Sequence, residues 1–135
     1  MIKVEWHVLG DFGIDPLWNY SRVLYAYLHP NEKEILYIGK ADGNTTLRKR
    51  WNRSGKEGFW EDLERERKIK THVPIIGDLI YDGNFSSKLL KEIEGTLIFF
   101  EEPWGNIQNQ KTVTARHGLE IKCTGFWPGQ KKYNF

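Results

Sequence analysis

The sequence contains very little cysteine: Cys123 is the single one among 135 residues. One cysteine excludes an intramolecular disulfide framework and a multi-cysteine zinc site, and it fits a reducing, cytoplasmic location. The sequence also has no apolar run near the roughly 18 residues of a membrane span, so we expect no membrane association. Glu5 stands where a secretory signal needs an apolar run, so we expect no secretion either.

The chain also carries little excess charge, because 20 basic residues face 18 acidic ones and the formal net charge is +2. The total charge therefore says little about nucleic acid, but its distribution says more. Residues 47–56 include five basic residues and no acidic one, and residues 111–135 include five basic residues and one acidic one. Two basic segments on a nearly neutral protein suit contact with phosphates, whereas solvated surface segments are the alternative interpretation.

The length and composition indicate one folded domain over residues 1–135. Hydrophobic residues make up 39% of the chain and aromatic residues 14%, which excludes a disordered chain. Alternating or β-branched segments predict strands at residues 3–9, 23–29, 35–40, 73–81 and 119–124. Capping residues and apolar periodicity predict helices at residues 46–51, 59–70 and 87–101. This order of elements predicts an α+β fold with a small mixed or antiparallel sheet and flanking helices.

The hairpin expected at residues 23–40 is rich in tyrosine. Tyr25 and Tyr27 share one face of their strand, and Tyr37 lies on the partner strand just before Gly39 and Lys40. Glycine at this point permits the close approach of another segment or a ligand. Paired phenols beside a cation can polarise a water or a phosphate oxygen, because nearby positive charge favours the phenolate. Ordinary packing of tyrosines across a sheet is the alternative.

The helix expected after this hairpin is strongly basic. Leu47 and Trp51 are four residues apart and share its core face. Lys49 and Arg50 lie beside that face, and Arg48 projects away from it. An arginine at the edge of a packed face is better held than a free one, and its planar fork suits phosphate, so Arg50 is a candidate phosphate ligand.

The helix expected at residues 87–101 carries an apolar stripe with a carboxylate at its edge. At about 100° per residue, Glu94 falls about 40° from Leu90, on the rim of the stripe. Glu92 falls on the opposite, solvated side with Lys88. A carboxylate at the rim of a core-facing stripe costs free energy unless a cation meets it. That cation is either a structural arginine or a divalent metal with hard oxygen ligands.

Together these segments resemble the signature of the GIY-YIG endonucleases. The resemblance is carried by VLY at residues 23–25, LYIGKA at 36–41, LRKRW at 47–51, EGTLI at 94–98 and PWGN at 103–106. Tyr25 and Tyr37 are twelve residues apart, as the hairpin of that family requires. The resemblance extends over about residues 22–110, and residues 111–135 form a basic extension.

The resemblance implies hydrolysis of a phosphodiester of double-stranded DNA by water in one step, with one divalent metal, Mg²⁺ or Mn²⁺. Glu94 would hold the metal, and Arg50 would stabilise the charge that builds on the phosphoryl oxygens. Tyr25 would serve as the general base and Tyr37 as its positioning partner, or the reverse, with Lys40 drawing off the phenolic proton.

The remaining assignments follow from the same resemblance. Asn106 matches the asparagine that closes the motif set, with Asn109 as a rival. The residues expected to contact DNA are Lys40, Arg48, Lys49, Arg53, Lys111, Lys131 and Lys132. Two alternatives stay open: a DNA-binding module of the same fold that has lost cleavage, and a partner-binding domain that uses some of the six tryptophans as anchors. The four histidines lack the spacing of a metal motif, so we expect them to pack or to lie on the surface.

Overall fold

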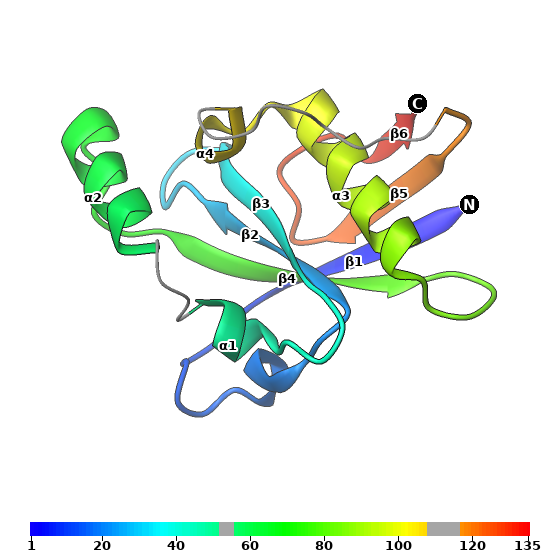
Figure 1. The fold of residues 1–135 in the computed structure, drawn as a ribbon. Helices are drawn as coiled ribbons and strands as arrows, with labels where there is room; N and C mark the ends of the chain where they lie inside the picture. Colours follow the sequence, from blue (N-terminus) through cyan, green and yellow to red (C-terminus); the bar gives the residue numbers. More distant parts are fainter. Residues whose placement is uncertain (52–55, 108–116) are drawn as a thin grey trace.

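The protein folds around one six-stranded sheet in the order β3-β2-β4-β1-β5-β6 (Figure 1). The computed structural model describes residues 1–51, 56–107 and 117–135. The strands are β1 (Ile2–Val8), β2 (Val23–Leu28), β3 (Ile35–Ala41), β4 (Val73–Ile80), β5 (Glu120–Gly125) and β6 (Lys132–Asn134). The helices are η1 (Pro16–Asn19, a 3-10 turn), α1 (Leu47–Trp51), α2 (Lys56–Arg67), α3 (Ser87–Glu101) and α4 (Trp104–Ile107). Among the strand pairs, β1 and β5 are parallel and the others antiparallel, so the predicted α+β class with a mixed sheet is confirmed.

The predicted hairpin is formed by β2 and β3. Tyr25 pairs with Gly39 and Tyr27 with Tyr37, and the register shifts after Tyr27. Because side chains alternate along a strand, all three tyrosines lie on the same face of the sheet. β3 is an edge strand, so its outer side is open to groups from the helices.

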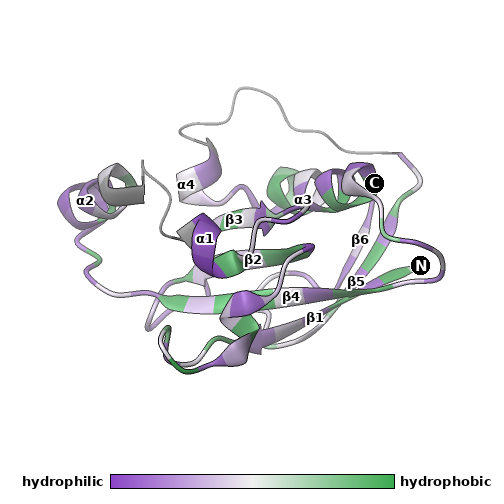
Figure 2. Ribbon diagram, turned by 60° about the horizontal axis from the view of Figure 1, so that its bottom comes forward, coloured by the Kyte–Doolittle hydropathy of each residue, from purple (hydrophilic) through white to green (hydrophobic). Residues whose placement is uncertain are grey.

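Helices cover both faces of the sheet. On one face, α3 packs its apolar stripe, including Leu90, Ile93 and Leu97, against alternate residues of the strands. On the other face, Trp18 of η1, Leu47 of α1 and a leucine of α2, Leu63, pack around the tyrosines. Figure 2 shows hydrophobic segments along the strands, whereas α1 is mainly hydrophilic. The edge strand β3 therefore lies where elements of the two layers meet.

β4 is regular at Gly77, and a Cβ at this position would lie 2.9 Å from the Trp6 ring and from Val4 Cγ1. Gly77 thus makes room for a buried tryptophan of the neighbouring strand. α3 ends at Glu101, as predicted, and the short helix α4 begins immediately after Pro103. β6 is only three residues long, too short for a periodic pattern. In the part of the chain that the structure describes, none of the helices combines the length and apolarity needed to cross a membrane.

Candidate functional site

The site predicted from the sequence is built around the middle of β3, where Gly39 lies beneath the ring of Tyr25. A Cβ at residue 39 would stand 2.4 Å from Cζ and 2.5 Å from the hydroxyl oxygen of Tyr25. Real Cβ atoms do not approach other atoms so closely, so only glycine allows the Tyr25 ring to lie across the edge strand. The phenol of a tyrosine from the second strand is thereby brought to the edge of the sheet.

Three tyrosine rings pack together on this face. The ring centroids of Tyr25 and Tyr37 are 6.1 Å apart, and those of Tyr27 and Tyr37 are 5.2 Å apart and stacked. Tyr25 and Tyr27 are fully buried, whereas Tyr37 is partly exposed. Burial raises the pKa of all three phenols, and for Tyr25 and Tyr37 the positive charge of Arg50 counteracts that rise. Each phenol is therefore neutral near pH 7 in the free protein.

Arg50 reaches these phenols from α1, which begins with a polar cap. The Thr46 hydroxyl accepts a hydrogen bond from the backbone N–H of Lys49 (3.2 Å). Burial disfavours the charge of the Arg50 guanidinium, but charge and hydrogen-bond interactions with Tyr25, together with the charges of Tyr37 and Glu94, raise its pKa overall. Arg50 Nε is buried and has no hydrogen-bond partner among the described residues. The Arg50 guanidinium is thus permanently charged, and no described residue accepts a hydrogen bond from its Nε–H group.

Glu94 approaches the same phenols from α3, on the other face of the sheet. Burial raises its pKa to about 7, and the positive charges of Lys40, Arg50 and Lys91 counteract the rise. Glu94 in turn acts on Tyr25, Tyr37 and Arg50 by its charge. The structure therefore brings together five predicted residues from four elements, which we call the candidate site: Tyr25, Tyr37, Lys40, Arg50 and Glu94.

The position predicted for Glu92 is wrong. Its exposed fraction is 5%, so the residue is buried rather than on a solvated side of α3. The buried arc of α3 is wider than its apolar stripe, and Glu92 lines a pocket together with Ile2 and Tyr81. Glu94 is the more accessible of the two carboxylates.

Asn106 supports the site from behind rather than facing it. Its side-chain oxygen accepts a hydrogen bond from the N–H of Ile38 (2.8 Å), and its side-chain nitrogen donates to the carbonyl oxygen of Ile38 (2.9 Å). Both atoms of the buried amide are thus engaged by the outer edge of β3. This closed pair of bonds fixes the strand next to Tyr37 and Gly39, so Asn106 is a positioning residue.

The residues predicted to contact DNA do not form one surface. Lys40 lies at the candidate site and Lys49 is exposed on α1. Arg48 instead holds the preceding loop: its guanidinium donates to Asn19 Oδ1 and to the carbonyl oxygen of Phe12, and lies 4.6 Å from the Phe12 ring centroid. Lys131 and Lys132 belong to the opposite edge of the sheet, at and before β6. Arg53, Lys111 and Asn109 lie outside the described residues.

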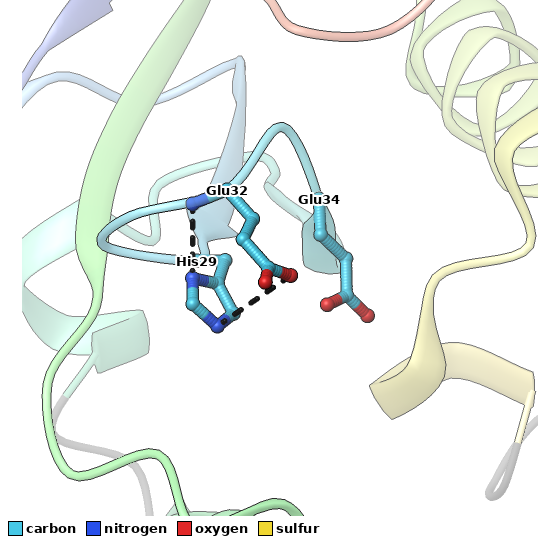
Figure 3. A group of neighbouring side chains, drawn as sticks. All are labelled: His29, Glu32 and Glu34. Atoms are coloured by element: carbon cyan, nitrogen blue, oxygen red, sulfur yellow. Dashed lines mark hydrogen bonds and ion pairs between the residues drawn. The ribbon is translucent and has the colours of Figure 1, made fainter.

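A second group of potential metal ligands lies in the β2–β3 turn and was not predicted. His29, Glu32 and Glu34 each offer a ligand atom, and these atoms lie within 4.8 Å of one another (Figure 3). However, His29 Nδ1 accepts hydrogen bonds from the backbone N–H groups of Asn31 (3.0 Å) and Glu32 (3.1 Å).

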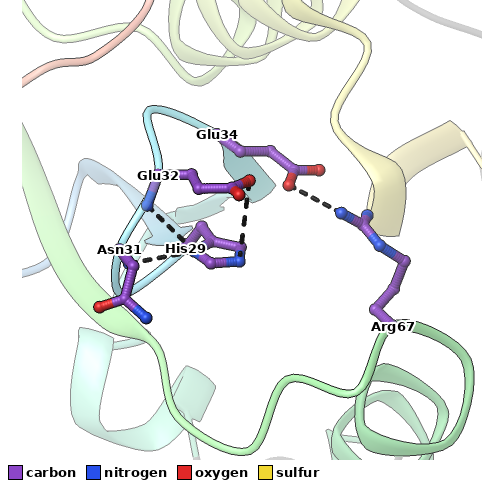
Figure 4. Close-up of polar contacts among 5 residues, drawn as sticks. All are labelled: His29, Asn31, Glu32, Glu34 and Arg67. Carbon is purple, nitrogen blue, oxygen red and sulfur yellow. Dashed lines mark hydrogen bonds and ion pairs between the residues drawn. The ribbon is translucent and has the colours of Figure 1, made fainter.

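These bonds fix the proton of a neutral His29 imidazole on Nε2, the nitrogen that faces Glu32 at 4.0 Å. An Nε2 that carries a proton cannot bind a metal. Glu34 is also paired with Arg67, with an N–O distance of 2.7 Å (Figure 4). The group is therefore explained by turn geometry and an ion pair. In the sequence, this group shows only as three ligand-type residues within six positions. His29 there accepts hydrogen bonds from the turn, and Glu34 pairs with Arg67.

No protein-family model, curated protein or solved structure matches this chain. The assignment of a function therefore depends on the chemistry that the candidate site offers.

Proposed function

We propose that the protein is a metal-dependent endonuclease of the GIY-YIG type that hydrolyses phosphodiester bonds of double-stranded DNA in the cytoplasm. One observation carries the proposal: the Arg50 guanidinium and the Glu94 carboxylate, from helices on opposite faces of the sheet, act on the same two phenols at the edge of β3. A purely structural pair of charges has no need for two phenols beside it. A phosphoryl-transfer site needs all three kinds of group.

Arg50 provides the group that binds the phosphate. Its buried Nε lacks a hydrogen-bond acceptor among the described residues, and a buried donor without an acceptor costs free energy. The Arg50 residue as a whole is partly exposed, and its planar guanidinium would donate to a phosphoryl oxygen and stabilise the negative charge that grows on that oxygen during attack. The hydrogen bond to Tyr25 holds the guanidinium in place for this role.

Glu94 provides the group that fits a divalent metal. Mg²⁺ and Mn²⁺ prefer hard oxygen ligands, and Mg²⁺ is commonly held by one or two carboxylates together with substrate phosphates. A carboxyl group with a pKa of about 7 is poorly solvated as an anion, so a cation beside it relieves the cost of burial. When bound, the metal supplies charge neutralisation of the scissile phosphate and of the leaving oxygen.

Tyr37 is the better placed general base. A general base must touch the attacking water, and Tyr37 is partly exposed, whereas Tyr25 is fully buried. A phenol with a raised pKa gives up its proton only when a nearby positive charge stabilises the phenolate anion. Arg50 supplies that charge, and Tyr25 holds the Tyr37 phenol by a hydrogen bond that lowers its pKa. This reverses the preference for Tyr25 that the sequence suggested.

Incubation of supercoiled plasmid with the purified protein tests the proposal. We expect nicked and linear DNA with Mg²⁺ or Mn²⁺ and intact plasmid with a chelator. Arg50→Ala and Glu94→Gln serve as controls against a contaminating nuclease, because both should lose cleavage. Intact plasmid over a series of divalent metals, with salt-sensitive DNA binding retained, would replace the nuclease by a DNA-binding module of the same fold. Loss of both activities would favour a partner-binding domain.

A further inference from the structure

Five aromatic rings form a continuous surface that starts at the candidate site. They are Tyr37 of β3, Phe59 and Trp60 of α2, His72 just before β4, and Trp104 of α4, and we call them the aromatic wall. Ring centroids are 5.5 Å apart for Tyr37 and Phe59, 4.9 Å for Phe59 and Trp60, and 5.9 Å for Phe59 and Trp104. Trp60 and His72 stack at 4.2 Å with an angle of 14° between their planes.

Core packing explains the inner side of the aromatic wall but not its outer side. The buried ring of Tyr27 lies behind it, with centroid distances of 4.8 Å to Trp60 and 5.2 Å to Tyr37. All five rings of the wall are nevertheless partly exposed. Burial lowers the pKa of His72 to about 4, so its imidazole is uncharged at neutral pH and offers a flat ring rather than a cation. Adjoining aromatic rings that each keep part of their surface exposed beside a candidate site are a candidate contact surface for a ligand.

The charges around the aromatic wall indicate what binds. The exposed side of α2 carries Glu61, Glu64 and Glu66, which would repel the phosphates of a duplex lying along this helix. A cation stands beside Tyr37 instead, because Arg50 acts on that residue by its charge, whereas Arg67, 5.9 Å from the Trp104 ring centroid, is paired with Glu34. Such a surface suits flat, uncharged groups with a phosphate at the Tyr37 side. Unpaired nucleobases have this chemistry, because each base presents a face that stacks on aromatic rings.

We infer that the aromatic wall stacks unpaired bases of a DNA strand whose neighbouring phosphate occupies the candidate site. The inference rests on the proposed function and gives the preferred substrate as duplexes that carry a single-stranded flap or gap, with uninterrupted duplex as the weaker substrate. Tyr37 belongs to both the aromatic wall and the candidate site. A base stacked on Phe59 would therefore belong to the nucleotide next to the phosphate that Arg50 binds. An uninterrupted duplex leaves the wall unused, because its bases are stacked on one another.

Binding of two fluorescein-labelled DNAs, measured by anisotropy in a chelator so that no cleavage occurs, tests this inference. One is a fully paired duplex and the other is the same duplex with a short single-stranded flap. A stacked base contributes between about fivefold and about 150-fold in affinity, so we expect the flap to bind at least about fivefold more tightly than the duplex. Trp60→Leu and Trp104→Leu should bind the two DNAs about equally. Phe99→Leu is the matched control, because Phe99 is 51% exposed on α3 and belongs to a different aromatic group, with Phe100 and Phe135.

A second measurement needs no variant and decides the matter if Trp60→Leu fails to fold. The base analogue 2-aminopurine, placed in the flap, should lose fluorescence on binding to the unaltered protein, because stacking on tryptophan quenches it. Equal affinity for both DNAs, or a flap preference that survives in both tryptophan variants, would overturn the inference. The nuclease proposal fails separately: plasmid left intact with Mg²⁺ would end it even where flap binding is strong. Equal cleavage and equal binding of both DNAs would end the stacking inference alone.

Discussion

The ammonium group of Lys40 lies 3.8 Å from one carboxylate oxygen of Asp42, at the end of β3. The other oxygen of Asp42 accepts hydrogen bonds from the hydroxyl of Ser87 (3.0 Å) and from the backbone N–H of Gly43 (2.7 Å). Ser87 is the first residue of α3, the helix that carries Glu94. Asp42 therefore orients the cation of the candidate site and ties β3 to the helix that supplies its carboxylate.

Replacement of Asp42 by Asn should slow the proposed cleavage and leave the connection between β3 and α3 intact. An asparagine oxygen can still accept from Ser87 and Gly43, but the attraction for Lys40 disappears. We expect single-turnover cleavage to fall about fivefold, the effect of a partly exposed ion pair near 1 kcal/mol. Ser87→Ala is the control, since it removes a hydrogen bond and no charge. It should lower the melting temperature slightly and leave the rate unchanged; an equal loss of rate would show that the link, not the charge, matters.

The raised pKa of Glu94 predicts a stability that falls as pH rises. The folded protein binds the Glu94 proton with a pKa of about 7, against 4.5 for an ordinary glutamate, so the folded state holds a proton that the unfolded state has lost between these values. The contribution of Glu94 to stability is therefore highest below about pH 4.5 and declines up to about pH 7, by up to about 3 kcal/mol. Glu94→Gln carries no such proton. Its melting temperature without metal should exceed that of the unaltered protein at pH 8 and match it near pH 4.

Magnesium provides a second readout that does not depend on cleavage. Added at pH 8, Mg²⁺ should raise the melting temperature of the unaltered protein and leave that of Glu94→Gln unchanged. Glu92→Gln is the matched control on the same helix. Glu92 is two residues from Glu94 and is buried, so its change keeps the helix and its size while the Mg²⁺ response persists. A Glu94→Gln protein that melts earlier at pH 8 would instead make Glu94 a structural partner of Arg50 and Lys40.

Gly39→Ala should separate the position of Tyr25 from the rest of the site. The added methyl group would overlap the Tyr25 phenol, so the ring must move off the strand edge, at a cost of about 1–3 kcal/mol. We expect DNA binding to persist and cleavage to be lost, measured at a temperature where the variant is folded. Gly58→Ala on α2 is the control, since no heavy atom lies within 4 Å of a Cβ there. Full activity in Gly39→Ala would mean that the Tyr25 ring is not needed at the edge.

Local rules were sufficient where the contacts are local. Strand alternation placed Tyr25 and Tyr27 on one face, and a helical rotation of about 40° placed Glu94 at the rim of its stripe. The same rule gave the wrong position for Glu92. That residue shares a pocket with Ile2 and Tyr81, and a helical period contains no information about segments outside the helix. The prediction that Arg48 projects away from the protein was wrong for a similar reason. Its partners Phe12 and Asn19 lie in an irregular loop, which no periodic pattern in the sequence predicts.

The two tyrosines of the candidate site should respond differently to loss of the hydroxyl group. Tyr37→Phe removes the partly exposed phenol and should abolish cleavage, with a loss of about 10²-fold or more for a general base. Tyr25→Phe removes a buried hydroxyl that interacts with Arg50 and should leave measurable turnover. Single-turnover rates at saturating DNA between pH 6 and 9 check this, because a log rate that rises with pH in Tyr25→Phe and not in Tyr37→Phe identifies the base. The opposite pattern would return that role to Tyr25.

The two arginines on α1 offer the sharpest contrast, because they are two residues apart and do different work. Arg50→Lys keeps a positive charge but loses the planar fork and the buried Nε donor, so turnover should fall by about 10²-fold or more while the melting temperature changes little. Arg48→Lys loses the bonds to Asn19 and Phe12 that hold the loop before β2. Its free energy of unfolding should fall by about 1 kcal/mol per lost hydrogen bond, which lowers the melting temperature. The folded variant should cleave at the normal rate. Melting curves and single-turnover rates on both variants check this. Equal losses of rate in the two would mean that α1 acts as a unit and that Arg50 has no special contact with the phosphate.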